Sequence, residues 1–219
     1  MASPFAELHR PGQPFLLPNA WDVMSAALLV EAGFPAVGTT SLGVAASAGL
    51  PDAAGATRAQ TLALARRLAR LPALITVDIE AGFSDDPGRV AELVAELHDH
   101  GVVGINIEDC RGDTLAPVDV QTRLIAAVRD AVPDIFINAR TDAYWLGLDR
   151  PLTETLTRVA AYRDAGAHGV FVPGVRAPAE IEAVVRAADL PVNVLADRPV
   201  PELAALGVAR VSCGSLLYR

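Results

Sequence analysis

Three apolar segments of this chain each end with two polar residues that are separated by one apolar residue. The pairs are Asp78 with Glu80, Asn106 with Glu108, and Asn138 with Arg140. Successive side chains of a strand point to opposite faces, so the two members of each pair share a face. Three carboxylates and one guanidinium would then meet where three neighbouring strands end. This excess of negative charge predicts a hard divalent cation, Mg²⁺ or Mn²⁺, among the oxygens.

The alternative is a structural network of ion pairs in which Arg140 holds the carboxylates of Asp78, Glu80 and Glu108. One arginine cannot neutralise three acids, and burying unpaired carboxylates is costly. A metal site is therefore favoured, with Asn106 as a neutral group that adds little charge. The four histidines show no zinc-ligand spacing and are not expected to be catalytic.

The chain contains no lysine, because all 18 residues counted as Lys or Arg are arginine. Schiff-base catalysis needs a side-chain primary amine, as does covalent attachment of pyridoxal phosphate. Carbonyl chemistry on this chain would therefore have to stabilise an enolate with a metal and arginine.

Composition predicts one soluble, cytoplasmic domain over residues 1–219. Hydrophobic residues make up 52%, and no stretch reaches the roughly 18 uncharged apolar residues of a membrane span. Residues 1–14 lack the apolar core of a secretory signal. A net charge of −8 argues against a nucleic-acid partner, and two distant cysteines are typical of reduced thiols.

Short apolar runs alternate with amphipathic stretches along the whole chain. The runs, which we expect to be strands, cover 15–19, 36–40, 74–80, 102–108, 135–140, 169–173, 192–196 and 210–214. Helical spacing of Ala and Leu fills the segments between them, for example 57–70, 87–98, 118–131 and 152–165. Eight such units predict an α/β fold, a (β/α)8 TIM-type barrel, with the eighth helix absent from the chain given. Active sites of such barrels form at the carboxyl ends of the strands, where the charged pairs are expected.

Two further segments could contribute to a site at that end. The turn 38–43, Gly-Thr-Thr-Ser-Leu-Gly, offers hydroxyls and free backbone N–H groups that could hold a carboxylate or phosphate, although a plain turn is an equal alternative. Asp52 could reach over the barrel mouth as a base or an outer metal ligand, or be only a turn residue.

Several motifs, in order and spacing, resemble the isocitrate lyase/phosphoenolpyruvate mutase superfamily over nearly the whole chain. They are PNAWD at 18–22, GTTSLG at 38–43, GLPD at 49–52, VDIEAGF at 77–83, GINIED at 104–109, NARTD at 138–142 and AYRDAGA at 161–167. The resemblance implies a Mg²⁺-dependent homo-oligomeric barrel enzyme that forms and collapses an enolate of a small carboxylate substrate.

Residue roles follow from the same resemblance. It implies Asp78 as the nearest metal ligand, with Glu80 and Glu108 acting directly or through water. It also implies that the backbone around Thr40, Ser41 and Leu42 holds a substrate carboxylate or phosphoryl group. Arg140 would bind the oxo acid, and Asp52 would lie beside the reacting centre.

The segment after the fourth strand departs from the lyases of that superfamily. Those enzymes carry a Lys-Lys-Cys-Gly-His lid motif, whereas residues 110–117 of this chain are Cys-Arg-Gly-Asp-Thr-Leu-Ala-Pro. A short loop would leave the site open to water, which favours hydrolysis or decarboxylation over guarded isomerisation.

Taken together, the charged cluster and the resemblance predict a Mg²⁺-dependent carbon–carbon lyase or related enolate-forming enzyme acting on a small 2-oxo or 2-hydroxy (di)carboxylic acid. Phosphonopyruvate or phosphoenolpyruvate mutase or hydrolase chemistry, and a non-catalytic metabolite-binding barrel, are the alternatives.

Overall fold

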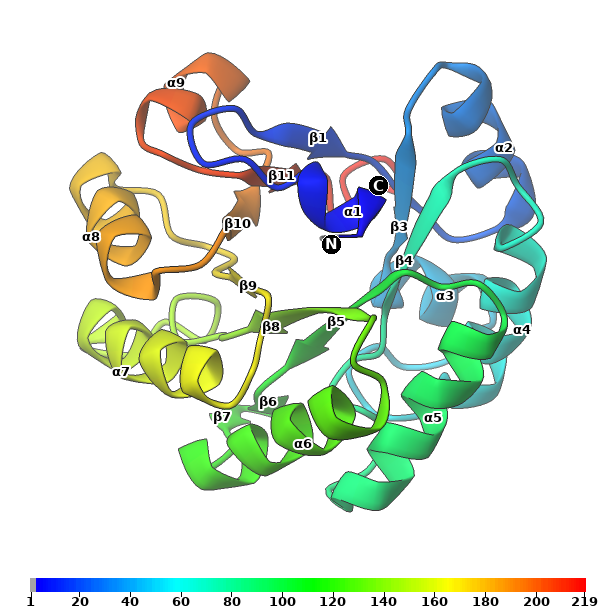
Figure 1. Cartoon of the computed structure of the whole chain (residues 1–219), viewed down its shortest axis with the longest axis horizontal. Coiled ribbons are helices and arrows are strands. Elements are labelled where there is room, and N and C mark those ends of the chain that lie inside the picture. The colour runs from blue at the N-terminus through cyan, green and yellow to red at the C-terminus, as the bar shows by residue number, and fades with distance from the viewer. Residues whose placement is uncertain (1–2) are drawn as a thin grey trace.

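The computed structural model describes residues 3–219 as a ring of parallel strands surrounded by helices (Figure 1). The strands, in spatial order, are β1 (Phe15–Leu17), β11 (Arg210–Ser212), β10 (Val192–Leu195), β9 (Gly169–Phe171), β8 (Phe136–Arg140), β5 (Gly104–Glu108), β4 (Leu74–Asp78), β3 (Ala36–Thr39) and β2 (Asn19–Ala20). All pairings in this sheet are parallel. The eight predicted strand positions are confirmed, with the first one divided into β1 and β2.

Pro18 explains both the division of the first strand and the closure of the ring. β1 pairs with β11 on one side and β2 pairs with β3 on the other. Pro18 has no N–H to donate, but its carbonyl oxygen accepts a hydrogen bond from Gly38 N at 2.9 Å. The two ends of the sheet are therefore joined through one interrupted strand, and the barrel is nearly closed, as predicted.

The outer layer consists of helices in the segments that connect successive strands (Figure 1). These are α2 (Val23–Glu31), α3 (Ser41–Ser47), α4 (Arg58–Leu68), α5 (Pro87–Asp99), α6 (Val118–Ala131), α7 (Pro151–Asp164), α8 (Pro178–Ala188) and α9 (Val200–Ala205). Proline begins α5, α7 and α8, where its missing N–H costs no hydrogen bond. After β11 the chain continues in turns, and no helix follows it within residues 3–219.

Apolar side chains on the outside of the strands pack against the helices and form the main core. Ile75, Val77, Ile105 and Ile137 are at most 1% exposed and belong to one cluster with buried residues of α4, α5 and α6. A short helix, α1 (Pro4–Glu7), lies across the centre of the ring at the amino end of the barrel (Figure 1). Its Phe5 packs with Leu17, Ala36 and Phe136 and fills that end of the barrel. A functional site is therefore expected at the opposite, carboxyl end of the barrel.

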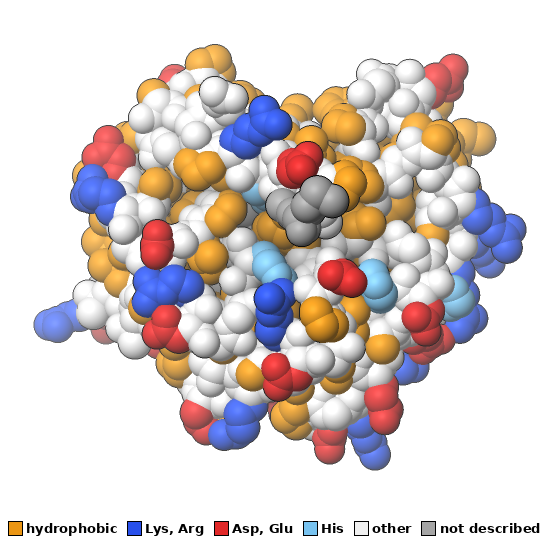
Figure 2. Space-filling model, in the orientation of Figure 1, with side chains coloured by type: hydrophobic (Ala, Val, Ile, Leu, Met, Phe, Trp, Pro, Cys, Tyr) orange, Lys and Arg blue, Asp and Glu red, His pale blue; other side chains and the backbone are white. Residues whose placement is uncertain are grey.

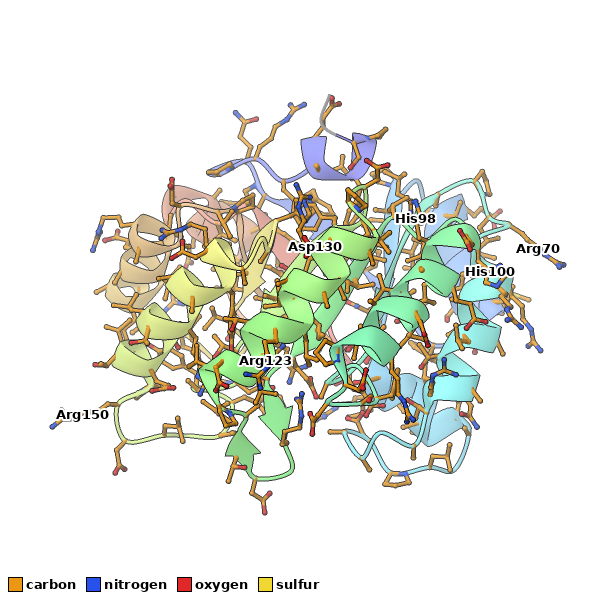
Figure 3. All side chains as sticks on the ribbon, turned by 60° about the horizontal axis from the view of Figure 1, so that its bottom comes forward. Arg70, His98, His100, Arg123, Asp130 and Arg150 are labelled. Carbon is orange, nitrogen blue, oxygen red and sulfur yellow. The ribbon has the colours of Figure 1, made fainter. Side chains whose placement is uncertain are left out.

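Polar and charged side chains are distributed over the surface without a dominant patch on the face at the amino end. Figure 2 shows acidic and basic side chains interspersed across this face. His98 and His100 lie at the end of α5 on the outside of the barrel (Figure 3), and His100 accepts a hydrogen bond from Arg66 at 2.8 Å. No helix within residues 3–219 combines the length and apolar character needed to span a membrane.

Candidate active site

A cavity of about 600 Å³ opens at the carboxyl ends of the strands. Its wall includes seven of the eight predicted site residues: Thr40, Ser41, Leu42, Asp52, Asp78, Glu108 and Arg140. β4 supplies Asp78, β5 supplies Glu108 and β8 supplies Arg140 as the last residue of each strand. The parallel register pairs Glu108 directly with Arg140, so strand geometry alone brings these two side chains together.

Two carboxylates fix the guanidinium of Arg140. Its Nη1 lies 2.8 Å from Glu108 Oε2, and its Nε donates to Asp142 Oδ1 at 2.7 Å. The rings of Trp145 and Phe171 lie 6.0 and 5.7 Å from its Cζ atom. Asp142 is fully buried, and its position at the end of the motif at 138–142 did not by itself predict a role for it. Arg140 therefore faces the cavity as a rigid donor suited to a carboxylate.

The acidic groups of the cavity are held in an environment that opposes their charge. Burial raises the pKa of Asp78, an effect that Arg140 opposes and that nearby Asp52 reinforces. Burial likewise raises the pKa of Glu108 to about 8, despite the adjacent Arg140 and with further repulsion from Asp78. Carboxylates whose negative charge is not balanced by their surroundings are the ligands that a hard divalent cation prefers. This set of oxygen ligands therefore fits Mg²⁺ or Mn²⁺.

Glu80 lies elsewhere than its spacing predicts. β4 ends at Asp78, and Glu80 takes a left-handed conformation with φ of 49°, so the strand alternation does not continue to it. Its carboxylate accepts hydrogen bonds from Gly55 N at 2.9 Å and from the Thr57 hydroxyl at 2.5 Å. The prediction that Glu80 shares a face with Asp78 is wrong, because the chain turns between them. Glu80 instead anchors the loop at 50–57, which carries Asp52.

The turn at 38–43 leads directly into a helix at the cavity wall. Thr40 is the N-cap residue of α3, and Ser41 and Leu42 form its first turn. All three line the cavity, and a backbone hydrogen bond from Ser41 lowers the pKa of Asp78. The expected role of this turn in holding a substrate anion stays a prediction.

The segment after β5 forms a small antiparallel hairpin of β6 (Cys110–Arg111) and β7 (Thr114–Leu115). Its residues Cys110, Gly112 and Asp113 reach the cavity wall. The sequence predicts only a short loop here, since two strands of two residues leave no periodic signal.

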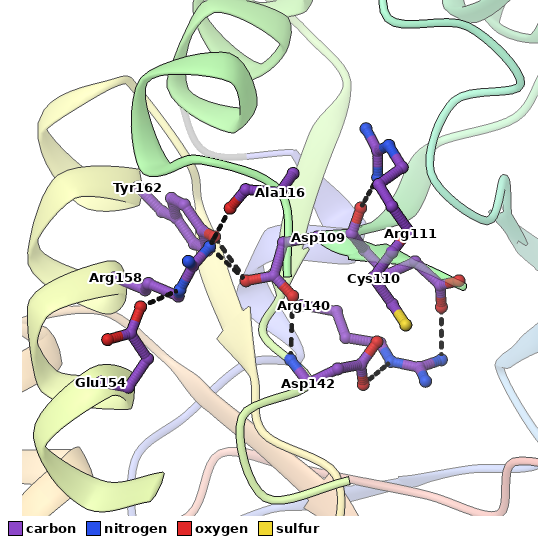
Figure 4. A network of polar contacts seen from close by, with 10 residues as sticks. Asp109, Cys110, Arg111, Ala116, Arg140, Asp142, Glu154, Arg158 and Tyr162 are labelled. Carbon is purple, nitrogen blue, oxygen red and sulfur yellow. Dashed lines mark hydrogen bonds and ion pairs between the residues drawn. The ribbon is translucent and has the colours of Figure 1, made fainter. Parts of the chain in front are cut away.

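A buried network fastens the base of this hairpin to the barrel (Figure 4). Asp109 Oδ2 accepts hydrogen bonds from Tyr162 OH at 2.6 Å and from Arg158 Nη1 at 3.1 Å. Arg158 Nη1 also donates to the carbonyl oxygen of Ala116 at 2.9 Å, on the far side of the hairpin. Asp109 Oδ1 accepts from the backbone N–H of Asp142 at 2.9 Å. The network thus connects α7, the hairpin and the partner of Arg140.

A second arginine lies inside the barrel beneath the cavity. Arg210, the first residue of β11, is fully buried, and its Nη2 donates to Asn106 Oδ1 at 3.2 Å. Burial lowers its pKa to about 9, and the attraction of Asp78 opposes this. Its guanidinium therefore carries its charge at neutral pH. Arg140 is the only arginine that the sequence predicts near the acids. Arg210 was not expected there, because its neighbours in the sequence are apolar.

The carboxylates do not form a complete metal cage by themselves. Within residues 3–219, no three acidic, histidine or cysteine side chains converge closely enough to hold a metal directly. A cation bound here would therefore need ligands beyond the protein side chains, such as water or substrate oxygens.

The chain is similar to known proteins over nearly its whole length. The family model described as phosphoenolpyruvate phosphomutase matches residues 5–219. An uncharacterized protein of Mycobacterium tuberculosis, Rv1998c, is 46% identical over 98% of this chain and 83% of its own length. The 2-methylisocitrate lyase of Bacillus subtilis is 30% identical over 90% of this chain and 67% of its own length.

A solved structure adds a ligand to the comparison. A phosphonopyruvate hydrolase in complex with oxalate and Mg²⁺ superposes with a TM-score of 0.84 at 25% identity, covering 98% of this chain and 81% of the hydrolase. Members of the family are thus enzymes with different reactions on related folds.

Proposed function

The chain belongs to the phosphoenolpyruvate phosphomutase family, and from that premise we propose that it is a Mg²⁺-dependent carbon–carbon lyase or related enolate-forming enzyme. Its substrate would be a small 2-oxo or 2-hydroxy (di)carboxylic acid. The observation that carries the proposal is the placement of Arg140 in the wall of the cavity that Asp78 also lines. Its guanidinium is held there by Glu108 at 2.8 Å and by Asp142 at 2.7 Å. A fixed arginine and a carboxylate in one cavity suit an oxo acid and a divalent cation.

In this proposal each residue has one task. Asp78 would hold Mg²⁺ or Mn²⁺, with Glu108 reaching it directly or through water. The bound cation would supply positive charge to the C2 oxygen of the substrate. Arg140 would grip the C1 carboxylate with a pair of parallel hydrogen bonds.

The remaining residues would manage the proton and the second carboxylate. Asp52, at the cavity wall, would take the proton of the C2 hydroxyl as the C2–C3 bond breaks and its electron pair enters the departing enolate. That proton then returns to the enolate carbon, so the products are a 2-oxo acid and a shortened carboxylate. The backbone at Thr40, Ser41 and Leu42 would hold the other carboxylate of the substrate.

A screen for turnover tests the proposal. The protein with Mg²⁺ would be incubated with 2-oxo diacids, 2-methylmalate-type acids, isocitrate and phosphonopyruvate, and the products identified by mass. We expect cleavage of a carbon–carbon bond in one of the diacids, and little cleavage of isocitrate because residues 110–117 lack the lyase motif. No turnover of any compound would favour the non-catalytic metabolite-binding barrel.

A second candidate is phosphorus–carbon chemistry on phosphonopyruvate or phosphoenolpyruvate. The likeness to the phosphonopyruvate hydrolase supports it, as does the hairpin of only two residues per strand, which gives water a route to the cavity. Release of phosphate from phosphonopyruvate, without carbon–carbon cleavage of any diacid, would replace the lyase with this candidate.

A further inference from the structure

The interior of the barrel contains a buried arginine side chain that has no role in the proposed chemistry. Arg210 is fully buried, and no carboxylate within residues 3–219 forms a salt bridge with it. Its Nε donates to Ser212 Oγ at 3.0 Å and its Nη2 to Asn106 Oδ1 at 3.2 Å. Burying a charge is costly, so a residue of this kind calls for an explanation beyond packing.

Arg210 determines which way the amide of Asn106 points. A guanidinium can only donate hydrogen bonds, so the atom of Asn106 that faces it must be the oxygen. The amide of Asn138 donates to the same oxygen at 2.8 Å, and both residues lie on neighbouring strands in direct register. A flipped Asn106 would place its NH2 group against the donors of Arg210 and against the NH2 of Asn138.

The NH2 group of Asn106 is consequently directed away from both of these donors. Asn106 lines the cavity and pairs in register with Asp78 on one side and Asn138 on the other. Among residues 3–219 no acceptor is found for its Nδ2 atom. A donor held in a cavity wall without a protein acceptor is available to a ligand oxygen.

We propose that Asn106 Nδ2 is a hydrogen-bond donor to an oxygen of the substrate, and that Arg210 is the positioning residue that fixes it. This subsite rests on the proposed function. The ligand atom would be an acceptor that carries or gains negative charge, either a carboxylate oxygen or the C2 oxygen. The positive charge behind Asn106 Oδ1 polarises the amide and strengthens its donation to such an oxygen.

The subsite also bears on which substrates the cavity accepts. A site that donates to an oxygen discriminates strongly against analogues lacking it, because the donor is then left unpaired. The structure therefore assigns Asn106 to selection of acids with an oxygen acceptor at this position over analogues with a methyl or methylene group there.

Oxalate with Mg²⁺ is the probe, because calorimetry measures its binding without a known substrate. We expect Asn106→Ala to weaken oxalate binding about 10-fold or more, the size of one hydrogen bond to a charged acceptor. Arg210→Met should weaken it similarly by releasing the amide. The double variant should bind no more weakly than Asn106→Ala alone, because Arg210 acts through Asn106.

Control variants separate these effects from damage to the barrel. Thr76→Val is isosteric and removes a buried hydroxyl that has no hydrogen-bond partner within residues 3–219, so oxalate binding should stay as in the native protein. Asn106→Asp keeps an oxygen toward Arg210 and Asn138, so it should fold even where Asn106→Ala does not, and it should still lose oxalate. Arg210→Lys keeps a donor to Asn106 and should retain affinity within about 3-fold of native. Thermal unfolding is recorded for each variant.

The outcomes distinguish the subsite from the function it rests on. Native-like oxalate affinity in folded Asn106→Ala or Asn106→Asp overturns the donor assignment alone. Additive losses in the double variant overturn the positioning role of Arg210. A native protein that binds no oxalate with Mg²⁺ present overturns the proposed function, and the subsite with it.

Discussion

At the scale of single residues, the fixed guanidinium of Arg140 gives a direct test of the proposed chemistry. We predict that Arg140→Lys lowers kcat/KM severely while the fold stays intact. Lysine keeps the charge but loses the planar pair of donors that grips a carboxylate. The loss should be about 2 to 4 kcal/mol in the transition state, or roughly 30- to 1000-fold in rate. Steady-state kinetics on the substrate found in the screen measures it.

The competing view makes Arg140 only a counter-ion for Glu108 and Asp142. In that case Arg140→Lys would be nearly as active as the native protein, and the structural role would appear in Arg140→Ala as a lowered melting temperature. Near-full activity of the Lys variant would remove Arg140 from the site.

Residues at strand ends were predictable from spacing because a regular strand fixes the direction of each side chain. Asp78, Glu108 and Arg140 end β4, β5 and β8 and line one cavity, as their alternation predicts. Glu80 comes two residues after β4, in a left-handed turn that no periodicity encodes. Arg210 was missed for a different reason, since a charged residue inside a barrel is costly and is not expected from its apolar neighbours.

At the scale of elements, the loop at 50–57 depends on Glu80. We predict that Thr57→Val makes this loop more mobile, because it removes the hydroxyl that donates to the Glu80 carboxylate. The hydrogen bond from the backbone N–H of Gly55 then remains to hold that carboxylate. Hydrogen exchange in 50–57 should rise several-fold, with Thr61→Val, a buried threonine of α4, as the control. Unchanged exchange would show that the loop is held by other contacts.

The hairpin β6–β7 depends on the buried network behind it. We predict that Tyr162→Phe loosens the hairpin and costs about 1.5 to 3 kcal/mol of stability, since it removes a hydrogen bond to the Asp109 carboxylate. Denaturant unfolding measures the stability, and hydrogen exchange of residues 110–116 measures the loosening. A stability loss without faster exchange in the hairpin would contradict the link between α7 and this segment.

The main elements were predictable, whereas their small connections were not. Eight apolar runs and the prolines at the starts of α5, α7 and α8 carry strong local signals. The hairpin has strands of two residues, and its position is set by Asp109 and Ala116, which contact a helix about 45 residues further along the chain. Such long-range contacts have no local sequence pattern.

At the scale of the whole molecule, the two ends of the barrel interior differ. The carboxyl end is the open cavity, while the amino end is filled by aromatic rings around His9. His9 stacks on Phe136 with ring centroids 4.0 Å apart, and its Nδ1 lies 2.9 Å from the carbonyl oxygen of Phe5. Its other ring nitrogen is buried without a partner within residues 3–219. This packing requires a neutral imidazole.

The pH dependence of global unfolding should report this neutral histidine. Burial, with a further contribution from the charge of Arg210, lowers the pKa of His9 from 6.5 to about 3. Below pH 6.5 the unfolded chain binds a proton that the native state does not, so the contribution to stability is full above pH 6.5 and falls toward pH 3. The slope is about 1.4 kcal/mol per pH unit. Between pH 7.5 and pH 5 the loss should reach about 2 kcal/mol.

Comparison with His9→Phe isolates this effect. The raised pKa of Glu108, about 8, has the opposite effect on stability in part of this pH range. There the native state binds a proton that the unfolded chain does not, so this contribution to stability grows as the pH falls. That contribution is common to both proteins and cancels in their difference. The free energy of unfolding of His9→Phe, measured with denaturant, should therefore gain about 2 kcal/mol relative to the native protein as the pH falls from 7.5 to 5. A difference that stays constant with pH would show that His9 takes up its proton in the folded barrel.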